Sequence, residues 1–145
     1  MGIPILTKNG ELPPGEHKTT LAEIEKRFGK SNHKRVALMK GLWAASQNFI
    51  EAGVKNIWVN GSFVTSKAEP NDIDGCWEYT NAVDLEKLDS VFLMRNRVPM
   101  KEKYGLEFFI SNLVEGASGQ PFSNFFQLNR NQDPKGILVV HLGDK

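Results

Sequence analysis

The sequence predicts an α+β fold, because segments with helical periodicity and short β-prone apolar segments occur in one chain of 145 residues. Two helix-like segments come first, and the β-prone segments lie between Ile57 and Leu142. A chain of this length can bury one hydrophobic core, but it is too short for a catalytic domain with a sizeable second one. We therefore expect a single domain over residues 1–145.

The first 18 residues predict an extended N-terminal arm. Three prolines in this stretch fix the φ angle and disfavour helix at the residue before each of them. A helix is expected next, with Thr19 or Thr20 as its N-cap and Gly29 at its end. Its apolar side has helical spacing: Leu21, Ile24 and Phe28.

A second, longer helix is expected from Ser31 or Asn32 to Gly53, because glycine commonly ends a helix. Its spacing predicts a buried side made of the following residues: Val36, Met39, Trp43, Phe49 and Ile50. The tryptophans and most of the phenylalanines, including Phe122, Phe125 and Phe126, are expected in the core.

Four β-prone segments predict strands. They are Ile57–Asn60, Ile73–Tyr79, Gly105–Ile110 and Gly136–Leu142. A further helix is predicted over residues 84–95, since its acidic residues come first and its basic residues last, as the helix dipole favours. Residues 111–124 are rich in small and polar side chains and predict a loop or a short helix.

The most informative motif is a glycine turn followed by two carboxylates. Gly61 would let the backbone approach a phosphate group, and Ser62 offers a hydroxyl and an amide to it. Asp72 and Asp74 stand two residues apart on a predicted strand, so both side chains face the same way, with Cα atoms about 6.6 Å apart. Two carboxylates this close favour a bound cation. The alternative is that both are acids at a loop edge that cap turns.

A third acid, Glu107, stands among apolar residues of the strand predicted at 105–110. A buried glutamate is costly unless it is paired or bound to a metal. Asp72, Asp74 and Glu107 together therefore predict a site for Mg²⁺ or Mn²⁺. Lys67 lies in the loop between the two halves of the motif, where it could contact a phosphate or simply be a solvated lysine.

The ordered set Gly61-Ser62, Asp72-Ile73-Asp74 and Leu106-Glu107-Phe108 resembles the active-site signature of the polymerase-beta-type nucleotidyltransferase superfamily. This resemblance covers roughly residues 32–110, the expected catalytic core, with residues 111–145 as a C-terminal loop and strand. It implies a small mixed β-sheet flanked by helices. A narrower resemblance, to a family of short bacterial and phage nucleotidyltransferase-like proteins, spans nearly the whole chain. Its marks are Gly2-Ile3-Pro4, Leu12-Pro13-Pro14-Gly15-Glu16-His17, Gly61-Ser62-Phe63-Val64-Thr65, Pro70-Asn71-Asp72-Ile73-Asp74 and Pro134-Lys135-Gly136-Ile137.

The resemblance implies transfer of a nucleoside monophosphate from a nucleoside triphosphate to a hydroxyl of RNA or protein, or of a small molecule. Two Mg²⁺ ions would be held by the three acids, and the triphosphate would lie near Gly61, Ser62 and Lys67. It also implies a toxin-antitoxin or phage-defence setting with an antitoxin or partner protein. One subgroup that modifies a partner toxin carries an arginine two residues after the serine, where this chain has Val64.

The charge composition argues against one class of function, nucleic-acid binding. With 18 Lys and Arg against 17 Asp and Glu, the net charge of +1 lacks the strong positive field of a dedicated nucleic-acid binder. An RNA-binding adaptor is therefore the least favoured function. The main alternative is a non-catalytic nucleotide-binding or partner-binding module on the same fold.

The cysteine and histidine content argues against a disulfide and against a zinc site. Cys76 is the only cysteine, which excludes an internal disulfide, and we expect it to pack in the core. The three histidines, at positions 17, 33 and 141, lack zinc-ligand spacing. The sequence contains no long apolar run and no secretory signal, so we expect a cytoplasmic protein without membrane association. We also expect a homodimer or a partner protein to complete the site for a large acceptor.

Overall fold

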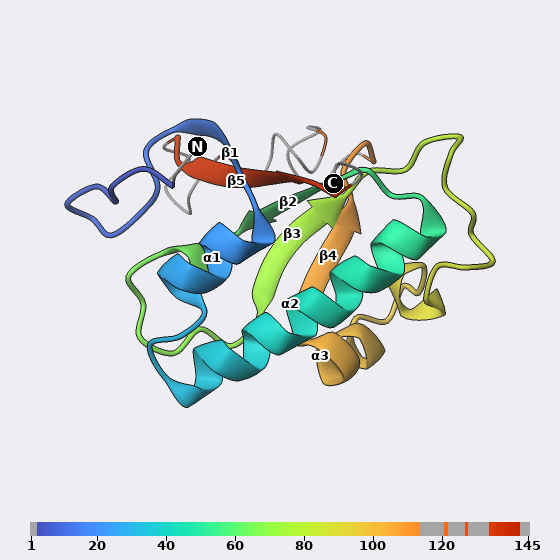
Figure 1. Cartoon of the computed structure of the whole chain (residues 1–145), viewed down its shortest axis with the longest axis horizontal. Coiled ribbons are helices and arrows are strands. Elements are labelled where there is room, and N and C mark those ends of the chain that lie inside the picture. The colour runs from blue at the N-terminus through green and yellow to red at the C-terminus, as the bar shows by residue number, and fades with distance from the viewer. Residues whose placement is uncertain (1–2, 114–120, 122–126, 128–133, 143–145) are drawn as a thin grey trace.

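The computed structural model describes residues 3–113, 121, 127 and 134–142. In this part of the chain, five strands form one mixed sheet in the order β1-β5-β2-β3-β4, and three helices lie on one of its faces (Figure 1). The strands are β1 (Gly15–Thr19), β2 (Asn56–Asn60), β3 (Ile73–Trp77), β4 (Leu106–Ile110) and β5 (Gly136–His141). The helices are α1 (Leu21–Phe28), α2 (His33–Ala52) and α3 (Val98–Tyr104). The predicted α+β class and mixed sheet are confirmed.

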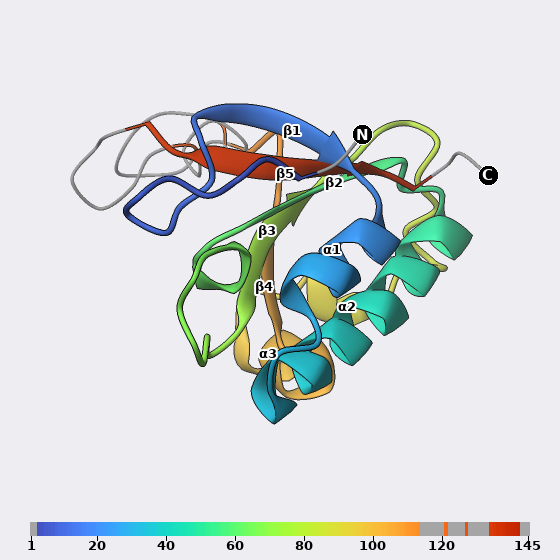
Figure 2. The same ribbon diagram turned by 60° about the vertical axis from the view of Figure 1, so that its left-hand side comes forward.

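The strand β5 lies between β1 and β2 in the sheet. It pairs in parallel with β1 on one side and antiparallel with β2 on the other. Beyond β2, the chain adds β3 antiparallel to β2 and β4 parallel to β3. Figure 2 shows the twist of this sheet, with α1 and α2 on the same side of it. The β3–β4 register places Asp74 beside Glu107, and the β2–β3 register places Asp74 beside Asn60.

Side chains of the central strands alternate between the helix-covered face and the opposite face. Ile73, Trp77 and Phe108 belong to the hydrophobic core between the sheet and the helices. Since neighbouring residues on a strand point to opposite faces, Asp74 and Glu107 point away from that core. The two acids therefore lie on the sheet face that the helices leave uncovered.

A cluster of aromatic rings ties α2 to the sheet. The ring of Phe49 on α2 lies 6.1 Å from Trp77 of β3 and 6.1 Å from Phe108 of β4, measured between centroids. Its centroid is 4.5 Å from that of Phe92. All four side chains are at most 2% exposed, so this cluster fixes the position of β3 and β4 beneath the helix.

The first two helices begin and end at predicted caps. Thr20 Oγ1 accepts a hydrogen bond from the N–H of Glu23 (3.2 Å), and Asn32 Oδ1 accepts one from the N–H of Arg35 (2.9 Å). The long helix α2 ends at Gly53, which has a φ of 91°. These caps confirm the two expected helices and their approximate ends.

The buried side of α2 differs from the predicted one. Val36, Trp43 and Ile50 are 36%, 41% and 40% exposed, although their spacing suggested a core position. The helix has more than one apolar stripe, and the stripe that faces the sheet is completed by small and polar residues. The buried residues are Arg35, Leu38, Met39, Leu42, Ala45, Ser46, Phe49 and Ala52.

The extended arm expected over residues 1–18 is wrong in its last part. Residues from Gly15 onward form β1, which pairs with β5 near the other end of the chain. Leu12, just before it, is 2% exposed, and its carbonyl accepts the N–H of Gly136 at 3.0 Å. Pairing with so distant a strand leaves no signal in the local sequence, where the prolines favour an irregular arm.

The helix expected over residues 84–95 is also wrong. Asp84 Oδ1 accepts the N–H of Glu86 (3.0 Å), and Asp89 Oδ1 accepts the N–H of Val91 (3.2 Å). Such side-chain bonds compete with the backbone bonds of a helix. Only a single 3₁₀ turn forms there, over Ser90–Phe92.

The helix that does form in this region, α3, was not predicted. It has only seven residues, with proline in its first turn, and it ends at Gly105, which has a φ of 72°. Proline at a helix start and glycine past its end are a recognised pair of signals, but so short a segment carries little periodicity.

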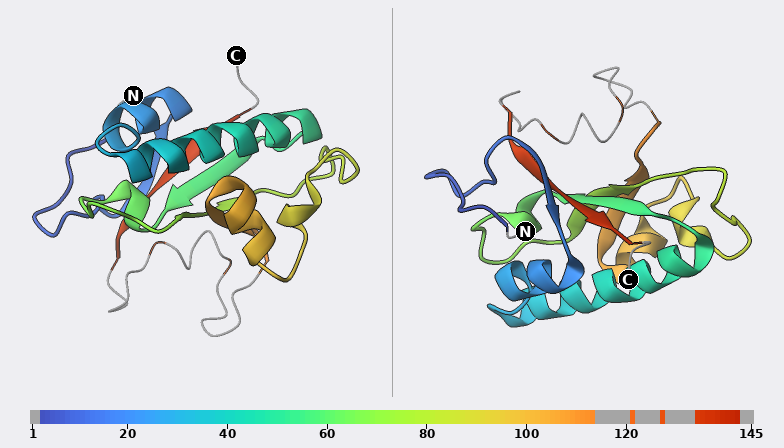
Figure 3. Two further views of the ribbon diagram at one scale, coloured as in Figure 1. Left: turned by 90° about the horizontal axis from the view of Figure 1, so that it is seen from below. Right: turned by 45° about the horizontal axis from the view of Figure 1, so that its top comes forward.

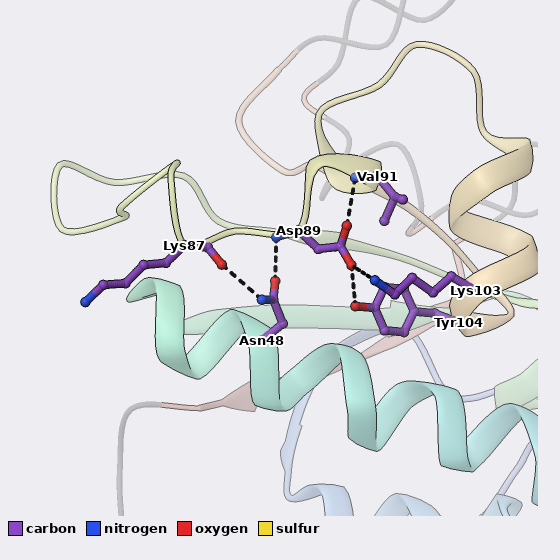
Figure 4. A network of polar contacts seen from close by, with 6 residues as sticks. All are labelled: Asn48, Lys87, Asp89, Val91, Lys103 and Tyr104. Atoms are coloured by element: carbon purple, nitrogen blue, oxygen red, sulfur yellow. Dashed lines mark hydrogen bonds and ion pairs between the residues drawn. The ribbon is translucent and has the colours of Figure 1, made fainter.

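Asp89 ties the 84–95 segment to α2 and α3 (Figure 4). Its Oδ2 accepts the hydroxyl of Tyr104 at 2.6 Å and the ammonium group of Lys103. Its backbone N–H donates to Asn48 Oδ1 at 2.8 Å, and Asn48 Nδ2 donates to the carbonyl of Lys87 at 3.0 Å. This network holds residues 84–95 against α2 and α3, although the segment forms no α-helix.

The C-terminal part agrees with expectation where it is described. The final strand β5 confirms the strand expected over 136–142, and Figure 3 shows it in red as part of the sheet. Most of the segment expected as a loop over 111–124, and Phe122, Phe125 and Phe126, lie outside the described residues. Among the described residues, no helix has the length and apolar character needed to cross a membrane.

Candidate functional site

Three acidic side chains meet where β3 and β4 begin. Asp72 immediately precedes β3, Asp74 is its second residue, and Glu107 is the second residue of β4. One carboxylate oxygen from each lies within 4.8 Å of the others, and all three residues are partly buried. The structure therefore brings together the three acids that the sequence singled out.

This crowding changes the proton affinity of the central acid. The pKa of Asp74 is raised to about 7, first by burial, then by the negative charges of Asp72 and Glu107 and by a hydrogen bond with the Asp72 carboxyl. The charge of Lys135 acts in the opposite direction. A divalent cation would compensate this excess of negative charge, as metal ions do in carboxylate sites.

The glycine turn lies directly against Asp74. Gly61 has a φ of 78°, and a Cβ atom built on it would lie 2.4 Å from Asp74 Oδ2. A side chain at position 61 would therefore collide with one of the acids. Ser62 follows and begins a 3₁₀ turn that ends at Val64.

A buried arginine anchors the loop that follows the turn. Arg35 on α2 is 3% exposed, and burial lowers the pKa of its guanidinium group. The group lies between two rings, 5.2 Å from the centroid of Phe63 and 5.9 Å from that of Phe28. Its Nη atoms donate to the carbonyls of Phe28, Ser62, Phe63, Thr65 and Lys67. Arg35 thus fixes the loop beside the acids, a role that no local sequence signal indicated.

The side chain of Lys67, expected near a phosphate, lies elsewhere on this loop. It lines a cavity of about 200 Å³ together with Arg27 and Arg35, and none of the three acids lines that cavity. Its carbonyl is one of the acceptors of Arg35. The structure therefore does not bring Lys67 together with the acids.

Lys101 on α3 does contact the acids. Its Nζ lies 3.0 Å from Asp72 Oδ2, and this hydrogen bond and the charge of Asp72 raise the pKa of Lys101. The charges of Glu107 and Asp74 act on it as well. Four residues earlier on the chain, Arg97 interacts with the charge of Glu107 and donates from Nη1 to the carbonyl of Phe108 (3.1 Å). Sequence reasoning missed both, although they stand four apart just before the strand of Glu107.

A second lysine approaches from the other side. Lys135 precedes β5, and burial lowers its pKa, while the charges of Glu11 and Asp74 act in the opposite direction. The motif Pro134-Lys135-Gly136 had been noted, but nothing in the sequence tied it to Asp74. The site thus combines three carboxylates with one lysine on α3 and one lysine just before β5.

Two further residues near the motif, Cys76 and Val64, are buried and take no part in the chemistry of the site. Burial raises the pKa of the Cys76 thiol, and the residue is 0% exposed, so it is a packing residue rather than a nucleophile. Val64 is 2% exposed and belongs to the core, so it is also a packing residue.

The donor set suits a hard divalent cation. Carboxylate oxygens are the ligands that Mg²⁺ and Mn²⁺ prefer, and Mg²⁺ sites commonly combine one or two carboxylates with substrate phosphates. The oxygens of Asp72, Asp74 and Glu107 are close enough to share such an ion. Their partial burial and the raised pKa of Asp74 fit a site that needs positive charge.

One comparison with known proteins gives a match. The model of a family described as "Family of unknown function (DUF6932)" matches residues 4–141, a range that includes every residue of the candidate site. No curated protein and no solved structure matches the chain. The chain belongs to this family of unknown function, DUF6932.

Proposed function

We propose that the protein is a metal-dependent nucleotidyltransferase with a polymerase-beta-type fold. It would transfer a nucleoside monophosphate from a nucleoside triphosphate to a hydroxyl of RNA or protein. The observation that carries this proposal is the meeting of Asp72, Asp74 and Glu107, with carboxylate oxygens within 4.8 Å of one another beside the Gly61 turn. Three acids held this close, on the sheet face that the described helices leave uncovered, contribute nothing to the hydrophobic core.

The three acids would hold Mg²⁺ or Mn²⁺. When bound, the metal would lower the pKa of the acceptor hydroxyl and balance charge on the triphosphate. In the reaction, the acceptor oxygen bonds to the α-phosphorus, the bond from that phosphorus to the β-bridging oxygen breaks, and pyrophosphate leaves. Glu107 would assist the reaction by taking the proton of the acceptor hydroxyl.

The surrounding residues favour a polyphosphate ligand. Lys101 and Lys135 approach the acids from two elements, so the site can balance the negative charge of a triphosphate as well as hold a cation. Gly61 leaves room at the turn, and Arg35 holds the loop that follows in one conformation. Positioning of this kind is the main contribution that a protein makes to phosphoryl-group transfer.

Of the two acceptor classes, we propose RNA first. The toxin-modifying subgroup carries an arginine at the position of Val64, and here that side chain is part of the core. Transfer to protein, within a toxin-antitoxin or phage-defence pair, stays the second expectation.

The test is label transfer from each of the four nucleoside triphosphates, carrying the label on either the α- or the γ-phosphorus. The protein is incubated with Mg²⁺ and either total RNA or lysate protein, and Asp74→Asn is compared with Asp84→Asn. Asp84 is an exposed aspartate outside the site, so its variant controls for loss of a negative charge.

The expected result is transfer of the α-label by the wild type and by Asp84→Asn, and none by Asp74→Asn. Triphosphate binding without any transfer would instead support the non-catalytic module. Transfer of the γ-label alone would refute nucleotidyl transfer, since a kinase moves that phosphate.

A further inference from the structure

The ammonium group of Lys101 lies among the negative charges of the three acids. Its ammonium group pairs with Asp72 at 3.0 Å and interacts with the charges of Glu107 and Asp74. The pair joins a side chain that is 44% exposed to one that is 14% exposed. A positive group belonging to the protein therefore lies against one of the three carboxylates that would bind a metal cation.

The backbone of Lys101 is fixed, while its side chain can move. The preceding residue, Met100, is 0% exposed, and its Sδ accepts the N–H of Phe108 in β4 at 3.2 Å. The carbonyl of Lys101 accepts the N–H of Gly105, where α3 turns into β4. Lysine has a flexible four-carbon stem, so its ammonium group can turn without any change in α3.

We propose that Lys101 is an exchangeable counter-ion of this site. In the metal-free protein its ammonium group neutralises Asp72, and when a divalent cation takes that carboxylate, the ammonium group moves to the phosphates of the bound polyphosphate. This inference rests on the proposed function, because it takes the three acids as metal ligands.

The reason is that two cations compete for one carboxylate. A divalent ion on Asp72 repels a neighbouring ammonium group, and the freed group is attracted to the negatively charged phosphates that arrive with the metal. Loss of the ammonium group therefore has opposite effects on the two ligands. Metal alone binds more tightly because its competitor is gone, and polyphosphate binds less tightly because it loses a contact.

A purely structural ion pair predicts something different. If Lys101 only secured α3 against the start of β3, its removal would loosen the three acids. The affinities for metal and for polyphosphate would then both fall, or neither would change. The two roles are therefore distinguished by the sign of the change in metal affinity.

The experiment measures two affinities by calorimetry in four proteins: the wild type, Lys101→Met, Lys101→Arg and Lys103→Met. Lys103 stands two residues along α3 and pairs with Asp89 instead, so its variant removes the same kind of ion pair away from the acids. The first probe is Mn²⁺ alone, and the second is inorganic tripolyphosphate at saturating Mg²⁺.

We expect Lys101→Met to bind Mn²⁺ about 3- to 10-fold more tightly and tripolyphosphate about 10-fold less tightly than the wild type does. Lys101→Arg keeps the positive charge and should stay within about 3-fold of the wild type for both probes. Lys103→Met should leave both affinities unchanged.

Three results would overturn the inference, and each is distinct. If the wild type binds Mn²⁺ but Lys101→Met binds it equally or less tightly, only the role of Lys101 is refuted. If Lys103→Met shows the same pattern as Lys101→Met, the effect is not specific to Asp72. If the wild type binds no Mn²⁺, both this inference and the proposed function fail. The expected pattern in a protein that transfers no label would support the counter-ion role and refute catalysis.

Discussion

Gly61 and Asp74 approach each other so closely that a Cβ atom on the glycine would lie 2.4 Å from Oδ2 of the aspartate. The two residues flank the loop between β2 and β3, and Asn60, next to the glycine, is the register partner of Asp74. The conformation of the turn and the position of the carboxylate are therefore set together. The glycine is needed at this point both for its φ of 78° and for the space that it leaves.

The substitution Gly61→Ala should displace the Asp74 carboxylate. We expect Mn²⁺ affinity to fall by about 10-fold or more, and the free energy of unfolding to fall by about 1–3 kcal/mol. The control is Gly15→Ala, because Gly15 also has a positive φ, of 111°, but a Cβ there meets nothing within 4 Å. Calorimetry with Mn²⁺ and urea denaturation measure the two effects. Mn²⁺ binding by Gly61→Ala at wild-type affinity would show that the contact does not position the acid.

The raised pKa of Asp74 makes the metal-free protein less stable as the pH rises. The folded state holds a proton on this group up to about pH 7, whereas the unfolded chain loses it near the ordinary value of 3.8. The wild type should therefore lose stability relative to Asp74→Asn between those pH values, by roughly 4 kcal/mol at pH 8, since each pKa unit of the shift is worth about 1.4 kcal/mol. Urea denaturation from pH 4 to pH 8 without metal measures the difference. If the wild type were as stable as Asp74→Asn at pH 8, the raised pKa of Asp74 would be contradicted.

Asp89 should show the opposite pH dependence. Burial disfavours its charge, but hydrogen bonds from Lys103, Tyr104 and the N–H of Val91 outweigh this and lower its pKa. Its contribution to stability is therefore present above the ordinary aspartate pKa and is lost as the pH falls below it. We expect Asp89→Asn to cost about 1 kcal/mol at pH 7, with a difference that shrinks below pH 4.

The matched control for Asp89 is Asp84→Asn. Asp84 is exposed, and its side chain accepts a hydrogen bond from the N–H of Glu86, so its variant should change the free energy of unfolding much less. Denaturation curves for both variants at pH 7 and pH 3 make the comparison. Equal losses at pH 7 would mean that the network of Figure 4 has no special stabilising role.

Arg35 should matter for stability and for the site at once. Replacing it with methionine removes the donors to five backbone carbonyls and should cost about 3 kcal/mol in the free energy of unfolding. The loop beside Gly61 should also loosen, so tripolyphosphate affinity should fall at temperatures where the variant is folded. Arg27→Met is the control, because its guanidinium group also lies near the Phe28 ring, at 5.5 Å, but the residue is exposed. Similar losses in both variants would contradict the anchoring role.

Local patterns in the sequence predicted much of this arrangement. The caps Thr20 and Asn32, the glycine at the end of α2 and the four predicted strands carry short-range signals that the structure confirms. The three acids could be grouped because each stands at a recognisable position: two on alternate residues of one strand and one among apolar neighbours of another.

The missed features depend on contacts between distant segments. The strand β1 exists because β5 pairs with it, and Lys135 reaches Asp74 only once β5 lies next to β2. Lys101 approaches Asp72 because α3 and β4 pack beside β3. The buried face of α2 was misjudged because it is selected by the sheet, which accepts Arg35 and leaves Trp43 exposed. Neither the burial of Arg35 nor the exposure of Trp43 can be predicted from the sequence of the helix alone.

The most direct test of the central claim is anomalous diffraction from crystals grown with Mn²⁺ and a triphosphate whose α–β bridge cannot be hydrolysed. We expect a manganese peak about 2.0–2.3 Å from carboxylate oxygens of Asp72, Asp74 and Glu107. The triphosphate should lie beside the Gly61-Ser62 turn. A manganese peak elsewhere, or a triphosphate bound away from the three acids, would contradict the account.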